Sequence, residues 1–189
     1  MNQVYIESER LIIRSFQLGD EVAIYKLNSN PIVQKYTGDR MIHSVEQAKE
    51  LLTNIVFNDY NLHGYGRLAV IYKPDNKLIG FTGFKYLPEL SETDLGYRFL
   101  PEYWGKGIAT ESSIMSLNYG FQELGLEKIY AFAEPENKAS GAVLKKIGFT
   151  QTQLASYPGE EDQEAVEWYL LTKDDYERLN MSPRAQSRG

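Results

Sequence analysis

The pattern of apolar and polar residues in the first third of the chain predicts one strand followed by two helices. Residues 10–14, an apolar run between two arginines, are expected to form a strand. A helix follows from about 20 to 28, and Pro31 keeps it from extending. The second helix is expected to begin at a capping box. In this motif the Ser44 side-chain oxygen accepts a hydrogen bond from an otherwise unpaired amide of the first turn, and the Gln47 side chain bonds the backbone at the helix start. Its apolar face is formed by Ala48, Leu51, Leu52, Ile55 and Val56.

The middle of the chain reads mainly as strands. Residues 67–72 and 78–87 are expected to form a hairpin, and residues 93–100 a further strand. A glycine-containing loop then leads into a long helix that is closed by Gly125.

The last third of the chain alternates strand and helix. Strands are expected at 128–133, 149–154 and 165–172, and helices at 138–147 and up to about 179. The acidic, glycine-containing segment 157–164 is expected to be a mobile loop. With no internal repeat, the whole chain is expected to form one α/β unit with a mixed sheet.

Length and composition are those of one globular domain. The chain has 189 residues, 42% of them hydrophobic and 24% charged, which suffices for one core and is short for two. We expect a domain at 4–179 and a disordered tail at 180–189. No apolar run is long enough to span a membrane, and the N-terminus lacks the order of a signal peptide. We therefore expect a cytoplasmic protein without membrane association.

Charge and the supply of reactive side chains exclude several function classes. A net charge of -6 without clustered Lys and Arg argues against nucleic-acid binding, whereas an acidic surface can favour the approach of cationic substrates. The absence of cysteine excludes disulfides, thiolate metal sites and a cysteine nucleophile. His43 and His63 lack metal-ligand spacing, so no metal is expected.

The loop at residues 104–110 is the strongest candidate for chemistry. A strand, a glycine turn and a helix start together point free amides and a helix dipole at one place, which favours an anion. A Walker loop would need glycine at Leu100 and Ser or Thr at Gly107, and a dinucleotide fingerprint would need glycine at Thr110. Both are excluded. From the residues alone, an anion site and a plain tight turn are equally good interpretations.

Beyond this pattern, the loop resembles that of a known family. Residues 96–101 and 104–111 resemble the coenzyme A loop of the GCN5-related N-acetyltransferases (GNAT), which reads Arg/Gln-x-x-Gly-x-Gly/Ala. Gly107 and Ala109 occupy its last two fixed positions. Trp104 replaces the Arg/Gln, as is usual in the branch of ribosomal-protein N-terminal acetyltransferases.

A second motif lies at the matching distance. Residues 137–149 are similar to the family's Asn-x-x-Ala/Ser...Gly-Phe segment, in the same frame of thirteen residues. Glu9-Arg10-Leu11 near the start extends the resemblance to about residues 4–175.

The resemblance implies the acyl-CoA N-acyltransferase fold. This is a mixed, mostly antiparallel sheet of about seven strands, splayed in the middle and flanked by four to five helices. The pantetheine arm of acetyl-CoA would lie in the splay and pair with free backbone groups of Phe99 and Leu100. Asn137 would hydrogen-bond the same arm, although its position also suits a plain helix cap.

The resemblance also assigns the loop to the coenzyme pyrophosphate. The expected contacts are backbone amides rather than side chains, because Lys106 reads as a solvated side chain. The residues implied are Gly105, Lys106, Gly107, Ile108, Ala109 and Thr110.

Amide formation from a thioester needs a neutral amine and a proton donor for the leaving thiolate. Asp94 is the first candidate for the base, since several family members carry a carboxylate nearby, and the acidic loop 160–162 is the rival. Either could be an ordinary surface carboxylate. The family's usual acid, a tyrosine seven residues after the asparagine, is replaced by Leu144. The role passes to Ser140, which could equally be a serine that caps helix amides.

The expected enzyme transfers acetyl from acetyl-CoA directly to a primary amine in a ternary complex. The acceptor is a protein N-terminal α-amine or a small-molecule amine, and the sequence does not choose between them. The alternative, motivated by Leu144, is a coenzyme-A-binding module that has lost catalysis and acts through protein contacts. The family resemblance allows a monomer or a homodimer.

Overall fold

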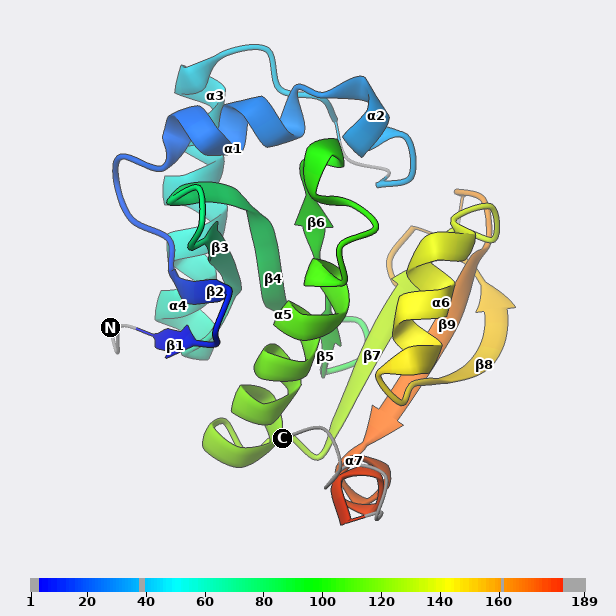
Figure 1. Cartoon of the computed structure of the whole chain (residues 1–189). Helices are drawn as coiled ribbons and strands as arrows, with labels where there is room; N and C mark the ends of the chain where they lie inside the picture. Colours follow the sequence, from blue (N-terminus) through cyan, green and yellow to red (C-terminus); the bar gives the residue numbers. More distant parts are fainter. Residues whose placement is uncertain (1–3, 38–39, 161, 182–189) are drawn as a thin grey trace. The chain divides into compact units, whose positions relative to one another are not determined.

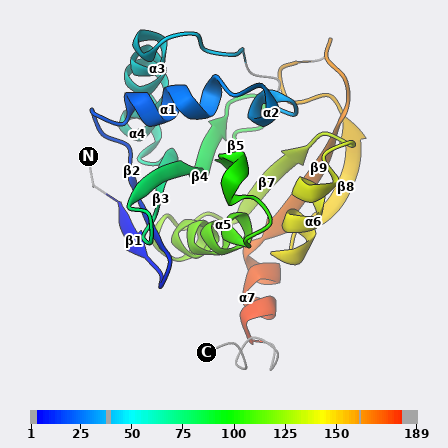
Figure 2. The same cartoon turned by 45° about the horizontal axis from the view of Figure 1, so that its top comes forward.

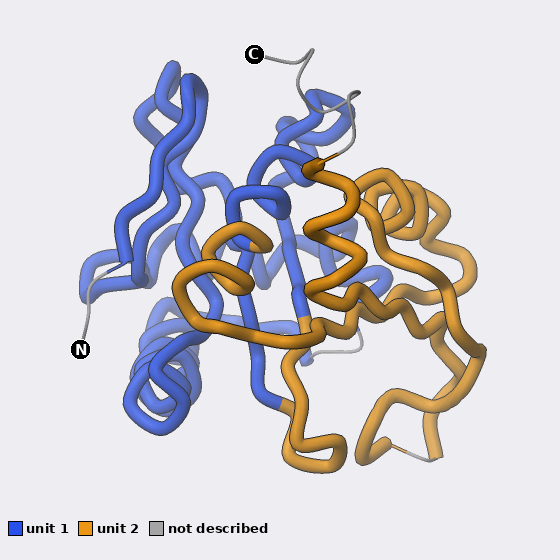
Figure 3. Tube along the Cα trace, turned by 90° about the horizontal axis from the view of Figure 1, so that it is seen from below, with its two compact units in different colours: residues 1–86, 95–116 blue, residues 87–94, 117–189 orange. Residues whose placement is uncertain are grey.

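The computed structural model describes residues 4–37, 40–160 and 162–181. The chain divides into two compact units that alternate along the sequence (Figure 3). Unit 1 comprises Met1–Tyr86 and Leu95–Ser116, and unit 2 comprises Leu87–Asp94 and Leu117–Gly189. The described residues form nine strands, which group as one set of five and one of four.

Unit 1 is built on antiparallel strands. Neighbouring strands pair in the order β1-β2-β3-β4, and β6 pairs with β4. Side chains alternate across β2, where Leu11 and Ile13 are fully buried. The strands are β1 (Tyr5–Glu7), β2 (Leu11–Ser15), β3 (Arg67–Tyr72), β4 (Lys77–Leu87) and β6 (Arg98–Phe99). The hairpin of β3 and β4 was predicted from the sequence, whereas β1 was not.

Helices α1 and α3 pack against each other within unit 1 (Figures 1 and 2). Pro31 ends the first helix as expected and also begins a new one, with the Asn30 side chain accepting the Ile32 amide. The helical segments are α1 (Glu21–Asn28), α2 (Pro31–Gln34), α3 (Val45–Leu51), a π-helical turn (Leu52–Val56), α4 (Phe57–His63) and a 3-10 turn (Pro101–Tyr103). Helix α5 (Ile108–Asn118) begins in unit 1 and continues as a π-helical turn, Tyr119–Glu123, that Gly125 follows in a left-handed conformation.

The apolar face predicted for the second helix is wrong at one position. Buried residues recur at an interval of four, whereas Ile55 is 55% exposed. An ideal α-helix turns 400° in four residues, so such a series would drift around the axis. The wider π-helical turn offsets that drift and keeps the series facing the core. The series is Ala48, Leu52, Val56 and Tyr60.

The strand expected at 93–100 is broken into two. Strand β5 (Glu92–Leu95) ends before Gly96, and β6 begins at Arg98. The Gly96 amide donates to the Gly83 carbonyl over 2.9 Å, and a Cβ on Gly96 would come within 2.5 Å of the Arg67 guanidinium. A side chain at Gly96 would therefore have to displace the Arg67 guanidinium.

Unit 2 contains the parallel pairing of the described chain. β5 and β7 (Lys128–Ala133) pair in parallel at Asp94 and Tyr130. β9 (Val166–Thr172) runs antiparallel to β7 and to β8 (Thr150–Ala155). Helix α6 (Lys138–Lys146) packs on β7 and β8, and α7 (Lys173–Met181) packs on β9.

The expected fold class is confirmed: the chain is α/β with a mixed, mostly antiparallel arrangement of strands. The described residues form nine strands rather than about seven, because β1 was not predicted and the strand expected at 93–100 is divided into β5 and β6. Helix α7 continues through Asn180 and Met181, past the expected domain end at 179, and the rest of the expected tail lies outside the described residues. Among residues 4–37, 40–160 and 162–181, no helix has the length and apolar character needed to cross a membrane.

Tyr60 connects three elements of unit 1 through its hydroxyl. It accepts the Phe16 amide over 3.0 Å and donates to the Arg67 carbonyl. Burial of the ring raises the pKa of this hydroxyl, so it stays protonated and keeps donating.

We expect Tyr60→Phe to lower the free energy of unfolding by about 1–3 kcal/mol, because two backbone groups lose their partner. Urea denaturation measures this change. Tyr5→Phe is the matched control, since Tyr5 is 61% exposed and should change stability little. Equal losses in the two variants would contradict the assigned role of the Tyr60 hydroxyl.

Candidate functional site

The loop between β6 and α5 takes a backbone conformation that favours glycine. Gly105 has φ +70° and Gly107 has φ +76°, both in the left-handed region that costs other residues energy. A Cβ at Gly105 would meet nothing within 4 Å, so the requirement there is conformational rather than spatial. The two glycines turn the chain sharply from the 3-10 turn into α5.

The start of α5 offers backbone donors to an anion. The Glu111 amide donates to the Gly107 carbonyl over 3.0 Å, which begins the helical hydrogen-bond pattern. The amides of Ile108, Ala109 and Thr110 precede this bond and have no acceptor within the helix. Free donors and the positive end of the dipole meet here, beside the exposed Gly107. The loop at residues 104–110 therefore stays the candidate anion site.

The aromatic residues ahead of the loop are anchored by polar contacts. The Trp104 indole N–H donates to the Phe99 carbonyl over 2.7 Å. The Tyr103 hydroxyl donates to Asp75 over 2.7 Å, and this hydrogen bond raises the pKa of Tyr103 to about 12. The Lys106 ammonium lies 5.3 Å from the centre of the Tyr103 ring, a cation–π contact. The exposed side chain of Lys106 thus packs beside Tyr103.

The structure corrects the expectation that Leu100 has a free backbone. Its amide donates to the Ile79 carbonyl over 2.9 Å, and its carbonyl accepts the Tyr103 amide over 3.0 Å. Phe99 differs, because its backbone groups alternate with those bonded to β4 and point away from that strand. The Phe99 carbonyl accepts the Trp104 indole, which leaves its amide as the candidate donor to a pantetheine arm.

Unit 2 contains the other predicted site residues. The side-chain oxygen of Asn137, Oδ1, accepts a hydrogen bond from the Ser140 amide over 3.1 Å, so Asn137 is the N-cap of α6. This cap uses the carbonyl oxygen and not the two N–H donors of the same side chain, so capping and coenzyme binding are compatible. Ser140 lies in the first turn, where Asn137 supplies the cap, and its side chain is half-buried.

The two candidate bases differ in burial. Asp94, on β5, is 5% exposed, so the interpretation as an ordinary surface carboxylate is wrong for it. Glu160 and Asp162 are exposed, and Glu161 lies outside the described residues. Leu144 is 1% exposed, so an apolar core position replaces the family tyrosine.

Sequence reasoning missed one hydroxyl near the first turn of α6. A Cβ added to Gly141 would lie 2.8 Å from the hydroxyl oxygen of Tyr169, which comes from β9. That hydroxyl donates to Glu167 over 2.5 Å. A sequence signal exists only in hindsight, because Gly141 sits in a helix where alanine would be preferred.

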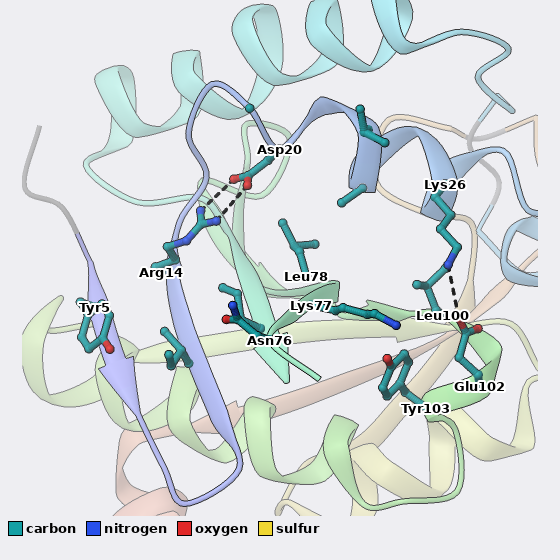
Figure 4. A pocket seen from close by; sticks show the side chains of 15 residues that line it. Tyr5, Arg14, Asp20, Lys26, Asn76, Lys77, Leu78, Leu100, Glu102 and Tyr103 are labelled. Atoms are coloured by element: carbon teal, nitrogen blue, oxygen red, sulfur yellow. Dashed lines mark hydrogen bonds and ion pairs between the residues drawn. The ribbon is translucent and has the colours of Figure 1, made fainter. Parts of the chain in front are cut away.

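An open groove of about 600 Å³ lies within unit 1 (Figure 4). At one end Arg14 and Asp20 form a forked ion pair, and at the other Lys26 pairs with Glu102 over 3.6 Å. Of the predicted site residues, Leu100 alone lines the groove. Lys77 also lines the groove, so its charged side chains are three cations and two carboxylates.

The predicted residues are divided between the two units. Phe99, Leu100 and the loop at 105–110 belong to unit 1, whereas Asp94, Asn137 and Ser140 belong to unit 2. Among the described residues, no group of three or more His, Cys, Asp or Glu side chains is placed to hold a metal ion.

Comparison with known proteins identifies the family. A family model described as an acetyltransferase (GNAT) domain matches residues 10–150. The chain is 34% identical over 149 residues to the uncharacterized N-acetyltransferase p20 of Bacillus licheniformis. The matched region covers 78% of this chain and 83% of the relative.

Two solved structures have similar folds. A GNAT-family acetyltransferase from Bacillus anthracis matches with a TM-score of 0.75 and 29% identity, over 90% of this chain and 99% of the other. Spermidine N-acetyltransferase from Vibrio cholerae, solved with CoA and spermine, matches with a TM-score of 0.74 and 21% identity, over 89% of this chain and 99% of the other. The chain belongs to the GNAT family, and it is an N-acetyltransferase that transfers acetyl to an amine.

Proposed function

We propose that this enzyme binds the pyrophosphate of acetyl-CoA at the start of α5 and transfers the acetyl group to a primary amine in a ternary complex. One observation carries the proposal: two left-handed glycines lead into a helix whose first amides have no helical acceptor. The residues fit the coenzyme, since backbone N–H groups at an exposed helix N-terminus are suited to a diphosphate. The family membership and the CoA-bound spermidine acetyltransferase of similar fold support this assignment.

Direct transfer is the proposed route. The chain has no cysteine to form a thioester acyl-enzyme, which fits a mechanism in which the amine nitrogen itself attacks the thioester carbonyl. The amine must be neutral, and Asp94 is the proposed base that receives its proton, directly or through a water. Asp94 is buried, which supports a role other than that of a solvent-exposed surface carboxylate.

The leaving thiolate needs a proton, and Ser140 is the proposed donor. Asn137 caps α6 by accepting the Ser140 amide, and Ser140 lies in the first turn of that helix. The N–H donors of Asn137 are proposed to hold the pantetheine arm.

We leave two acceptor classes within the proposal, a protein N-terminal α-amine and a small amine such as a polyamine. The net charge of -6 favours the approach of a cation in either case. The expected likeness to the ribosomal-protein N-terminal branch favours the first class, and the spermidine acetyltransferase fold favours the second.

The loop assignment predicts a charge effect at Gly107. We expect Gly107→Asp to bind acetyl-CoA at least about tenfold more weakly than Gly107→Asn, because a carboxylate repels the diphosphate at short range. Asn is the matched control, since it has nearly the same shape and the same left-handed backbone cost without the charge. Isothermal titration calorimetry on both folded variants measures the difference. Equal affinities would place the pyrophosphate elsewhere.

Ser140 and Asn137 should affect different kinetic constants. Ser140→Ala is expected to lower kcat about 100-fold while leaving the affinity for acetyl-CoA unchanged, as for a proton donor. Asn137→Ser keeps a capping oxygen but loses the N–H donors, so it should raise the KM for acetyl-CoA and leave stability nearly unchanged. Steady-state kinetics with thermal unfolding test both. Equal loss of kcat and of affinity in Ser140→Ala, or loss of neither, would reject the proton-donor role.

The acceptor class is tested by thiol release. Wild-type enzyme is assayed with acetyl-CoA against N-terminal peptides, spermidine, amino acids and aminoglycosides, and release above the amine-free rate on one class identifies the acceptor. Tight coenzyme binding without release on any amine would instead support the alternative of a catalytically degenerate binding module.

A further inference from the structure

The turn between β1 and β2 packs against the proposed pyrophosphate loop. Ser8 closes this turn: its amide donates to the Leu11 carbonyl over 2.9 Å, and its hydroxyl oxygen accepts the Leu11 amide over 3.0 Å. The Lys73 ammonium donates to the Ser8 carbonyl over 2.6 Å. The turn is therefore held on both sides, and it fixes Arg10, a residue of the Glu9-Arg10-Leu11 motif that the proposed function leaves without a role.

The Arg10 guanidinium makes contacts to two parts of the loop and helix. One terminal nitrogen donates to the Lys106 carbonyl over 3.1 Å. The other nitrogens donate to the Glu111 carboxylate, Nε over 2.9 Å and Nη2 over 2.5 Å. The Ser8 hydroxyl donates to the second Glu111 oxygen over 2.6 Å. All four residues belong to unit 1.

The bond to the Lys106 carbonyl sets the direction of the next amide. In a trans peptide the carbonyl and the following N–H lie in one plane and point in opposite directions. With the Lys106 carbonyl turned toward Arg10, the Gly107 N–H points away from Arg10. Glycine can adopt many backbone conformations, and Gly107 lies in the left-handed region. The bond from Arg10 therefore restrains the orientation of the Lys106–Gly107 peptide plane.

The bonds to Glu111 settle a conflict of charge. A carboxylate in the first turn of α5 stabilises the helix dipole, yet the same carboxylate opposes an incoming diphosphate. Arg10 and Glu111 are partly shielded from solvent, with side chains 38% and 24% exposed, so screening by water is incomplete. Arg10 thus neutralises the acidic group in the first turn of α5.

We propose that Arg10 is a positioning residue for the coenzyme, which orients the Lys106–Gly107 peptide and cancels the charge of Glu111. This inference rests on the proposed pyrophosphate site at the same loop. It assigns Arg10 no contact with the reacting atoms, so the expected consequence is on coenzyme affinity and not on the chemical step.

The charge part of the proposal predicts that one substitution rescues another. Arg10→Ala should weaken binding of coenzyme A by about tenfold or more, because a charge-assisted contact is lost and a carboxylate is left uncompensated. Arg10→Ala combined with Glu111→Gln should regain about threefold or more of that affinity, because the repelling charge is gone. Arg10→Lys keeps the charge but not the fork, so its affinity should lie between Arg10→Ala and wild type.

Isothermal titration with coenzyme A measures these affinities, and steady-state kinetics should show a raised KM for acetyl-CoA with kcat nearly unchanged. Arg14→Gln is the matched control, since Arg14 lies on the same turn-and-strand segment and forms a forked ion pair with Asp20 away from the loop. It should lower the melting temperature and leave the affinity for coenzyme A as in wild type.

The outcomes separate this inference from the proposed function. If wild type binds coenzyme A and Arg10→Ala binds it equally well, the positioning role is rejected while the function stands. If Glu111→Gln fails to restore affinity to Arg10→Ala, or if Arg14→Gln loses as much affinity as Arg10→Ala, the charge-cancelling role is rejected. A wild-type protein that neither binds coenzyme A nor releases thiol would overturn the proposed function itself.

Discussion

The conformation of two glycines is the constraint on which the loop at residues 104–110 depends. The chain must leave β6, pass a 3-10 turn and enter α5 with the first helical amides unpaired, and Gly105 and Gly107 make this possible in the left-handed region. A side chain at either position would cost energy whatever the free space. The loop is therefore specified by backbone geometry, and this explains why its expected contacts are amides and not side chains.

Freedom of this kind has to be restrained by neighbours, and unit 1 supplies them from both sides of the loop. On the strand side, the Trp104 indole is tied to the Phe99 carbonyl, and on the helix side the Lys106 carbonyl is tied to Arg10. Tyr103, held by Asp75, gives the Lys106 ammonium a ring to lie against. Donors fixed before the ligand arrives need no reorganisation on binding, which is the physical advantage of building the site this way.

Sequence reasoning predicted the elements with strong local signals and the loop with its glycines. Hairpin β3–β4, strand β7 and helix α6 agree with their predicted ranges to within one residue, because alternation, turn residues and caps are local. The errors are non-local. Ile55 lies in a π-helical turn that leaves it exposed, and the break at Gly96 lies beside the guanidinium of Arg67, 29 positions earlier in the chain. The occupied backbone of Leu100 likewise depends on its pairing with Ile79.

The chemistry expected of unit 2 is decided by what surrounds α6. A buried Leu144 makes this face of the helix part of the core, so a tyrosine from that position is not available to protonate a thiolate. The candidate polar side chains of α6 lie at its N-terminal end instead. Asn137 caps the helix through its side-chain oxygen, and Ser140 follows three residues later. Gly141 then admits the Tyr169 hydroxyl against the same turn. The hydroxyls of Ser140 and Tyr169 therefore lie near the N-terminal end of α6, where the helix dipole favours negative charge.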